Sequence, residues 1–277
     1  MAVPMPSDPL FGAPDPAAQP FALITGASSG IGEGFARALA ARHENLVLVA
    51  RSAARLNALA AELTAQHGVR AEVVAADLSD PNAADAIVAE LTLRGIAIGT
   101  LINNAGFGSH GAFAELDGKR ERDEIFVNVV ALVALTHALL PAMIARKQGA
   151  IVNVGSTASF QPVPYMAVYG ATKAFVLSFS EALAEEVREH GVRVVALCPG
   201  QTETSFFVGI DEARVGRART TEQVVATALR ALERGRVVVV DGFANYVLAN
   251  STRFAPRRLV ARIGAMIERP SSLKKRP

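Results

Sequence analysis

The sequence contains a single cysteine, Cys198, among 277 residues. One thiol cannot form a disulfide within the chain, and it cannot supply the several thiolates of a structural zinc site. Disulfide-stabilised and zinc-stabilised folds are therefore excluded, and a reducing, cytoplasmic compartment is the expected location. The five histidines show no metal-ligand clustering, so we expect no metal site.

The net charge is small, and the apolar runs are short. The 28 Lys and Arg residues nearly balance the 26 Asp and Glu residues, and the formal net charge is +2. Such a balance does not give a surface that coats nucleic acid, so no nucleic-acid partner is expected. No run approaches the roughly 20 apolar residues that span a bilayer, so no membrane-crossing segment is expected.

The chain divides into three parts. Residues 1–19 are rich in proline and alanine and lack the basic head and apolar stretch of a secretory signal, so we expect a disordered extension. Residues 20–242 alternate short β-branched or leucine-rich runs with longer segments of helical period. This alternation predicts a doubly wound, Rossmann-like α/β domain, with a parallel sheet of about seven strands and helices on both faces. Residues 243–277 form a basic C-terminal extension.

Strands and helices are expected to alternate along the central domain. The expected strands are Phe21–Thr25, Leu46–Ala50, Glu72–Ala76, Thr100–Asn103, Ala150–Gly155, Val192–Cys198 and Val237–Val240. The expected helices are Ile31–Arg42, Ala53–His67, Ala83–Leu93, a long one around Arg120–Arg146, Ala167–His190 and Thr221–Glu233. The glycines expected to end helices in left-handed turns are Gly68, Gly149, Gly191 and Gly235.

A glycine-rich turn joins the first expected strand to the first helix. It reads Thr25-Gly26-Ala27-Ser28-Ser29-Gly30-Ile31-Gly32. Such a turn presents the free N–H groups and the positive dipole end of the helix, and glycines without Cβ let a pyrophosphate approach the backbone. The turn lacks the Gly-Lys-Ser/Thr ending of an ATPase loop. We therefore expect a dinucleotide site whose contact residues are Gly26, Ser28, Ser29, Gly30, Ile31 and Gly32.

The end of the second strand indicates which nicotinamide cofactor fits. A carboxylate there would accept hydrogen bonds from a free ribose 2′-hydroxyl. The sequence instead places Arg51 after Ala50, and a guanidinium can pair with a 2′-phosphate. NADP(H) is therefore favoured over NAD(H).

A candidate proton-transfer pair stands at the start of a long helix. Tyr169 and Lys173 are four residues apart and so lie on one helix face. A nearby ammonium stabilises a phenolate, so Lys173 is expected to lower the tyrosine pKa from its usual ~10. Ser156, Thr157 and Ser159, at the end of the fifth strand, are candidates to hold a substrate carbonyl for the tyrosine.

These motifs together resemble the short-chain dehydrogenase/reductase family over about Phe21 to Gly242. The resemblance implies further cofactor contacts after the third, fourth and sixth strands, in addition to Tyr169 and Lys173. Those residues are Asp77 and Leu78, then Asn104, Ala105 and Gly106 of the Asn-Asn-Ala-Gly sequence, then Pro199, Gly200, Thr202 and Thr204.

The resemblance also implies a catalytic set formed by Asn128, Ser156, Tyr169 and Lys173. Ser156 lies thirteen residues before Tyr169, which is the family spacing and favours it over the two neighbouring hydroxyls. In the family, hydride moves between a nicotinamide and a carbonyl or alcohol carbon. The tyrosine exchanges the proton, the lysine orients the nicotinamide ribose, the serine polarises the carbonyl and the asparagine holds a relay water. Gly155, where many members have serine, is expected to enlarge the pocket slightly.

The implied activity is an NADP(H)-dependent oxidoreductase, and the alternative is a non-catalytic NADP-binding sensor. An apolar carbonyl compound or alcohol is the expected substrate, such as a ketoacyl chain, a steroid-like ketone or an aldehyde. The loop Glu203–Arg219, a candidate lid, and the loop after Gly106 carry apolar side chains that either line the pocket or pack against the body. They are Phe206, Phe207, Val208 and Ile210 in the first loop, and Phe107 and Phe113, beside Ser109 and His110, in the second.

The C-terminal extension contains a basic amphipathic helix that is expected to begin at Pro256. Its apolar side is formed by Leu259, Val260, Ile263, Met266 and Ile267, and its basic residues are Arg257, Arg258, Arg262 and Lys274-Lys275-Arg276. Three arrangements are open: packing on its own domain, covering a partner subunit, or lying on an anionic membrane surface. The family resemblance implies a homodimer or homotetramer built around the long fourth and fifth helices.

Overall fold

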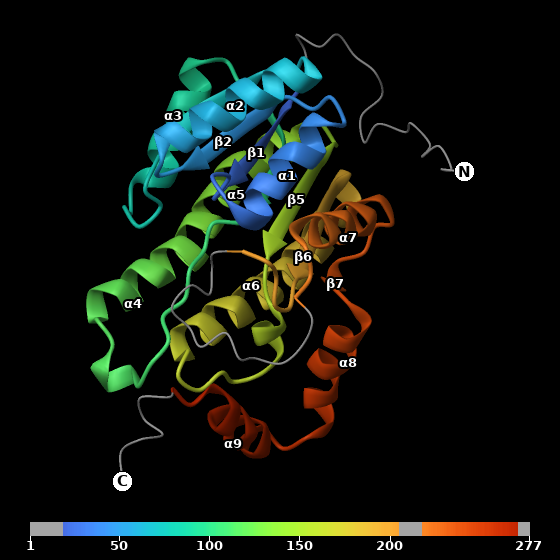
Figure 1. Cartoon of the computed structure of the whole chain (residues 1–277). Coiled ribbons are helices and arrows are strands. Elements are labelled where there is room, and N and C mark those ends of the chain that lie inside the picture. Colours follow the sequence, from blue (N-terminus) through green and yellow to red (C-terminus); the bar gives the residue numbers. More distant parts are fainter. Residues whose placement is uncertain (1–18, 205–217, 271–277) are drawn as a thin grey trace.

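A seven-stranded parallel sheet forms the centre of the computed structural model, which describes residues 19–204 and 218–270. The strand order is β3-β2-β1-β4-β5-β6-β7 (Figure 1). The strands are β1 (Phe21–Thr25), β2 (Leu46–Ala50), β3 (Ala71–Ala75), β4 (Ile98–Asn103), β5 (Gly149–Val154), β6 (Val192–Cys198) and β7 (Val238–Val240). The predicted Rossmann-like, doubly wound α/β fold is confirmed.

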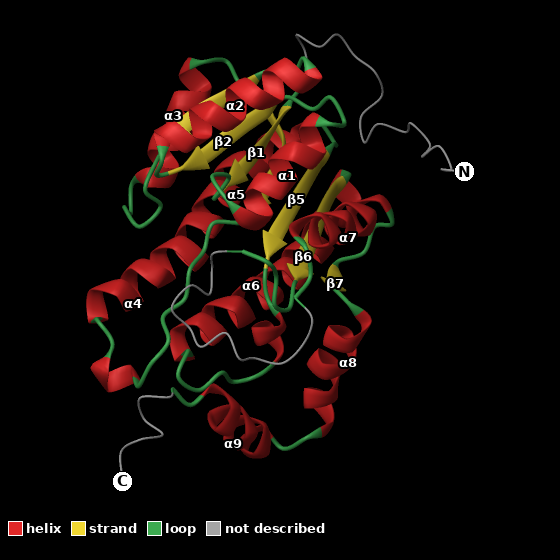
Figure 2. Ribbon diagram, viewed as in Figure 1, coloured by secondary structure: helices red, strands yellow, loops and turns green. Residues whose placement is uncertain are grey.

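Helices cover both faces of this sheet (Figure 2). They are α1 (Gly30–Ala40), α2 (Ala53–His67), α3 (Ala83–Leu93), α4 (Gly118–Ile125), α5 (Ala131–Ala145), α6 (Ala167–Val187), α7 (Thr221–Glu233), α8 (Phe243–Ser251) and α9 (Arg257–Glu268). Side chains alternate across each strand, so Ala22 and Ile24 pack toward α1, α2 and α7, whereas Phe21 and Leu23 pack toward α3, α5 and α6. Because both faces are buried, the strands are continuous apolar runs.

Two expectations about the elements were wrong in detail, and one helix was missed. The long helix expected around Arg120–Arg146 is divided into α4, a π-helical turn, η2 (Phe126–Val130), and α5. Helix α8 was not predicted. Gly149 does not end a helix: Lys147 takes the left-handed conformation there, with φ of +52°, and Gly149 begins β5. A Cβ at Gly149 would crowd Met143 of α5, which explains the glycine.

The helical run Gly118–Ala145 is long and apolar enough to cross a membrane, judged by length and composition alone. Its polar side chains Glu121, Glu124, Asn128 and Thr136 are buried within the chain. The run exposes charged residues in α4, whereas α5 buries apolar residues such as Leu135 and Met143 in the core.

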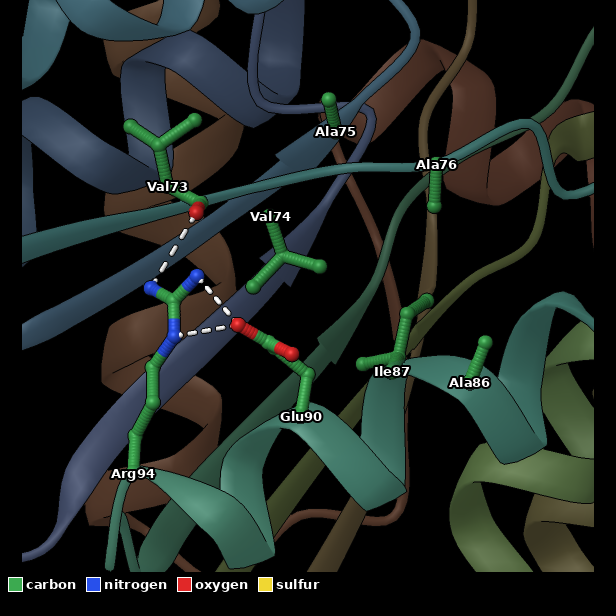
Figure 3. A pocket seen from close by; sticks show the side chains of 8 residues that line it. All are labelled: Val73, Val74, Ala75, Ala76, Ala86, Ile87, Glu90 and Arg94. Carbon is green, nitrogen blue, oxygen red and sulfur yellow. Dashed lines mark hydrogen bonds and ion pairs between the residues drawn. The ribbon is translucent and has the colours of Figure 1, made fainter.

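An open hollow of about 290 Å³ lies between the edge strand β3 and α3 (Figure 3). Arg94 pairs with Glu90 at 2.7 Å, and its guanidinium also donates to the Val73 carbonyl at 3.4 Å. A charged side chain over an edge strand discourages pairing with another sheet. We therefore interpret this hollow as a protected sheet edge.

Candidate active site

The sequence-predicted site residues gather at the carboxyl ends of the strands. In an open parallel sheet, ligands bind at this edge, where the strand order reverses. Here the order reverses between β1 and β4, which are neighbours in space although β2 and β3 separate them in sequence. The glycine-rich turn follows β1, and the Asn104–Gly106 segment follows β4.

The glycine-rich turn has the shape that a pyrophosphate requires. Gly26 and Gly30 adopt left-handed conformations, with φ of +66° and +58°. A Cβ at Gly32 would overlap the carbonyl oxygen of Gly26, so a side chain there would push the helix away from the turn. Ser29 is the N-cap of α1 but makes no capping hydrogen bond through its side chain among the described residues. The N-terminus of α1 is thus an anion-binding surface that fits a dinucleotide.

Asn104 supports the turn from β4. Its Nδ2 donates to the carbonyl oxygens of Thr25 at 2.9 Å and Gly26 at 3.3 Å. The Thr25 hydroxyl accepts from the N–H groups of Asn104 and Ala105, both at 3.0 Å. Asn104 and Ala105 therefore hold the cofactor turn in shape, in addition to the direct contacts that the resemblance implies.

Arg51 and Asp77 lie together at the ends of β2 and β3, and both are exposed. Hydrogen bonds from Ser79, foremost from its backbone N–H, hold the pKa of Asp77 below its ordinary value, and the charge of Arg51 acts in the same direction. An exposed guanidinium beside the turn can pair with a 2′-phosphate. Leu78 is buried and belongs to the hydrophobic core on the α3, α5 and α6 face of the sheet.

Tyr169, Lys173 and Ser156 are brought together beside this crevice. Tyr169 and Lys173 are buried, at 7% and 4% exposure, on one face of α6. The Tyr169 hydroxyl forms a side-chain hydrogen bond with Ser156. Lys173 Nζ lies 5.8 Å from the centre of the Tyr169 ring and donates to the Val154 carbonyl at 2.7 Å.

The pKa expectation for Tyr169 was wrong. Burial raises the pKa of Tyr169 to about 12, although the hydrogen bond with Ser156 opposes this shift. Burial also lowers the pKa of Lys173 to about 8. Desolvation dominates because both groups are enclosed. The phenol is therefore protonated at neutral pH, and as enclosed here it is a weaker acid than a free tyrosine.

Of the three hydroxyls after β5, Ser156 is the one that reaches Tyr169 through a side-chain hydrogen bond. Ser159 is buried, and its hydroxyl accepts from the Ser156 N–H at 3.2 Å, so it serves as a cap. Thr157 donates its N–H to the Pro199 carbonyl at 2.9 Å. Gly155 does not enlarge the pocket as expected, because a Cβ there would meet Cys198 Sγ at 3.1 Å and Ser159 Oγ at 3.2 Å.

Asn128 lies in the π-helical turn η2, and π turns often occur at functional sites. Its Nδ2 donates to the Phe107 carbonyl at 2.9 Å and to the Thr172 hydroxyl at 3.0 Å. Its Oδ1 accepts from the Phe107 N–H at 3.1 Å. The side chain thus joins the loop after β4 to α6, and its oxygen keeps one lone pair that could accept from a water.

The segment after β6 begins at the site and is anchored by an ion pair that the sequence did not reveal. Thr202 is buried and pairs with Arg219, which closes the base of the loop between them. The Arg219 guanidinium binds both carboxylate oxygens of the fully buried Asp241, at 2.9 and 3.1 Å. Thr204 lies against Gly30. The lid residues Phe206, Phe207, Val208 and Ile210 lie outside the described residues.

The loop after Gly106 meets the C-terminal helix. The His110 ring hydrogen-bonds with the Glu268 carbonyl at 2.8 Å, and Gly264 packs against Pro164. One side of α9 therefore packs on its own domain. Phe107 lies under the guanidinium of Arg120 at 4.9 Å, and Phe113 is 64% exposed. Among the described residues, no group of His, Cys, Asp and Glu could hold a metal ion.

The fold is a doubly wound α/β domain that places a glycine-rich turn and the Ser156, Tyr169 and Lys173 side chains at the same edge of the sheet. A family model described as short chain dehydrogenase matches residues 20–214. The chain therefore belongs to the short-chain dehydrogenase family.

Individual relatives agree with this assignment. A short-chain dehydrogenase from Sphingobium yanoikuyae, solved in complex with NADPH, is 38% identical with a TM-score of 0.78, and the match covers 89% of this chain and 94% of that one. The very-long-chain 3-oxoacyl-CoA reductase of Phaeosphaeria nodorum is 39% identical over 63% of this chain and 52% of its own. The sulfoacetaldehyde reductase of Chromohalobacter salexigens is 44% identical, and the match covers 66% of this chain and 73% of that one. The match with the very-long-chain reductase spans about half the length of that relative.

Proposed function

We propose that this protein is an NADP(H)-dependent oxidoreductase that transfers a hydride between the nicotinamide and a carbonyl or secondary alcohol carbon. The observation that carries the proposal is the buried Tyr169 phenol, hydrogen-bonded with Ser156 and flanked by Lys173, at the same sheet edge as the glycine-rich turn. NADPH bound to the similar Sphingobium dehydrogenase supports the choice of cofactor.

In this mechanism the nicotinamide supplies or accepts the hydride. Ser156 donates a hydrogen bond to the carbonyl oxygen and positions it at the Tyr169 hydroxyl. Tyr169 donates its proton to that oxygen during reduction and accepts it back during oxidation. The Lys173 ammonium orients the ribose and stabilises the phenolate that follows proton donation. Asn128 holds the relay water, and its hydrogen bonds keep the Phe107 loop in place.

The substrate class we propose is a lipophilic carbonyl compound, such as a ketoacyl chain, a steroid-like ketone or an aldehyde. Met166 and the Tyr169 ring both lie beside Gly108 and form an apolar surrounding for the phenol, and one relative is named for a very-long-chain 3-oxoacyl substrate. A panel of such compounds, with NADPH oxidation followed by absorbance, tests the proposal. Steady turnover with at least one compound supports an enzyme, whereas tight NADPH binding without turnover would support the sensor.

Arg51 sets the cofactor preference in this proposal. The Arg51→Ala variant should raise KM for NADPH about tenfold to a hundredfold, because it loses a charge-assisted pair with the 2′-phosphate. KM for NADH should change little. Arg55→Ala removes a neighbouring exposed arginine of α2 and serves as the control. An unchanged NADPH preference in Arg51→Ala would remove Arg51 from the site.

We further propose that the protein forms a homodimer or homotetramer through α5 and α6. Phe175 of α6 is 42% exposed and stacks on Phe179 at 5.8 Å between ring centres, and Val130, the residue directly before α5, is 38% exposed. Apolar surface of this kind is covered in most soluble proteins. Two copies of the helix pair would cover it.

We propose peripheral membrane contact for the free side of α9. Leu259, Ile263, Met266 and Ile267 are each more than 40% exposed, and Arg257, Arg258 and Arg262 are exposed on the same helix. Such a helix binds anionic lipid surfaces through apolar burial and charge. Removal of residues 256–277 should shift the protein from the pellet to the supernatant when it is sedimented with anionic vesicles. Equal pelleting of both proteins would end this proposal; a thermal unfolding curve checks that the truncated protein is folded.

A further inference from the structure

Glu124 is a buried carboxyl group that the proposed mechanism does not yet use. It lies in the last turn of α4, one helical turn before Asn128, and is fully buried. Its Oε2 accepts from the Ser109 N–H at 2.9 Å. Its Oε1 is buried and has no hydrogen-bond partner among the described residues. A buried carboxylate with an unpartnered oxygen is costly and therefore calls for an explanation.

Glu124 and Asn128 hold the same short segment of the loop after β4. Glu124 binds the backbone of Ser109, and Asn128 binds both backbone groups of Phe107. Gly108 lies between these anchors, and a Cβ there would meet the Tyr169 ring at 3.0 Å. The segment from Phe107 to Ser109 is therefore pressed against the face of the catalytic tyrosine.

Helix α4 packs against α6, so the charge of Glu124 faces the catalytic pair. The ionised carboxylate raises the pKa of both Tyr169 and Lys173. On its own helix, Glu124 faces Glu121 and Arg120. Burial raises the pKa of Glu124 to about 7, with Glu121 adding to the shift and Ser109 and Arg120 opposing it.

We propose that Glu124 is a positioning residue for the reaction: it fixes the Phe107–Ser109 segment against the Tyr169 ring, and its charge acts on the Tyr169–Lys173 pair. This inference rests on the proposed function for its kinetic consequences. Glu124 lies outside the family's catalytic set. Through it, the ionisation of a carboxyl group on α4 is coupled to the ionisation of Tyr169 and Lys173 on α6.

Two variants distinguish the role of the Glu124 hydrogen bond to the loop from the role of its charge. Glu124→Gln keeps an acceptor for the Ser109 N–H but removes the charge. In this variant, the alkaline limb of the pH profile of kcat for carbonyl reduction should move to lower pH by about 0.5 to 1 unit, because the negative charge that raises the pKa of Tyr169 is gone. KM should be nearly unchanged. Glu124→Ala also releases the loop, and kcat/KM should fall about tenfold to a hundredfold.

Glu44 offers a matched control. Burial raises its pKa to about 7 as well, but it precedes β2, at the opposite end of the sheet from Tyr169. Glu44→Gln should leave the pH profile of kcat unchanged. A Glu124→Gln profile that coincides with the wild-type profile, or an equal shift in Glu44→Gln, would overturn the inference.

A measurement without turnover separates this inference from the proposed function. In protein labelled with ¹³C at the glutamate side-chain carboxyl, the Glu124 resonance should titrate near neutral pH and be absent from Glu124→Gln. Lys173→Met removes a facing positive charge and should raise the pKa of Glu124 but not that of Glu44. If the wild type turns over no carbonyl, the proposed function fails, while this titration still decides the coupling: a Glu124 pKa that ignores Lys173→Met contradicts it.

Discussion

Replacement of Tyr169 by phenylalanine should lower kcat for carbonyl reduction by about 10²- to 10⁴-fold, the usual range for the loss of a general acid. The ring stays, so its packing against Gly108 and Met166 is kept. Only the hydroxyl that forms the hydrogen bond with Ser156 is lost. NADPH affinity, measured by fluorescence titration, should stay within about threefold because binding depends on the turn after β1.

The chain provides a control for this substitution. Tyr246 of α8 is 53% exposed and belongs to no part of the proposed site. Tyr246→Phe should have wild-type kcat. Near-wild-type turnover in Tyr169→Phe would mean that another group supplies the proton, and the catalytic assignment would be abandoned.

Replacement of Gly32 by alanine should abolish NADPH binding and lower the free energy of unfolding by about 3 kcal/mol. The new methyl group would overlap the Gly26 carbonyl oxygen and crowd Asn104 Nδ2, and both groups are held by the β1–β4 junction. The helix start must then move away from the turn, which separates the N–H groups that bind the pyrophosphate. Thermal unfolding and NADPH titration measure the two effects.

Gly34→Ala is the matched control on the same helix. A methyl group there would meet the Val225 side chain at 3.3 Å and Thr221 Cβ at 3.4 Å, which is close contact but not the overlap with backbone found at Gly32. Helix propensity favours alanine over glycine by up to about 1 kcal/mol, so Gly34→Ala should unfold at or near the wild-type temperature and bind NADPH normally. Similar losses in both variants would show that a methyl group at either glycine disturbs α1, and that the contact with the Gly26 carbonyl is not the specific cause.

Much of the fold could be predicted because its signals are local. A strand buried on both faces is a short apolar run, so the β1 and β6 ranges agree with the predicted ones residue for residue. The left-handed Gly68 ends α2 as the pattern indicates. The division of the long helix at Asn128 was not predictable, because a π turn depends on contacts with Phe107 and Thr172 that lie far away in sequence.

The sequence indicated which residues lie close together at the candidate site, but it did not indicate how burial shifts their pKa values. Motif spacing brought Ser156 and Tyr169 together, but the direction of the tyrosine pKa shift depends on how completely α6 is enclosed. The Arg219–Asp241 pair joins residues with no motif between them. Glu124 was missed because a glutamate in a charged helix looks like a surface residue until the loop after β4 is placed over it.

Hydride transfer between NADPH and a carbonyl carbon is the reaction proposed for this site. Its most direct test is a reaction with NADPH carrying deuterium on the transferable face of the nicotinamide, using the best compound of the carbonyl panel. Direct hydride transfer predicts deuterium on the carbinol carbon of the product and a primary kinetic isotope effect. Alcohol formed without deuterium from either face of the nicotinamide would contradict it.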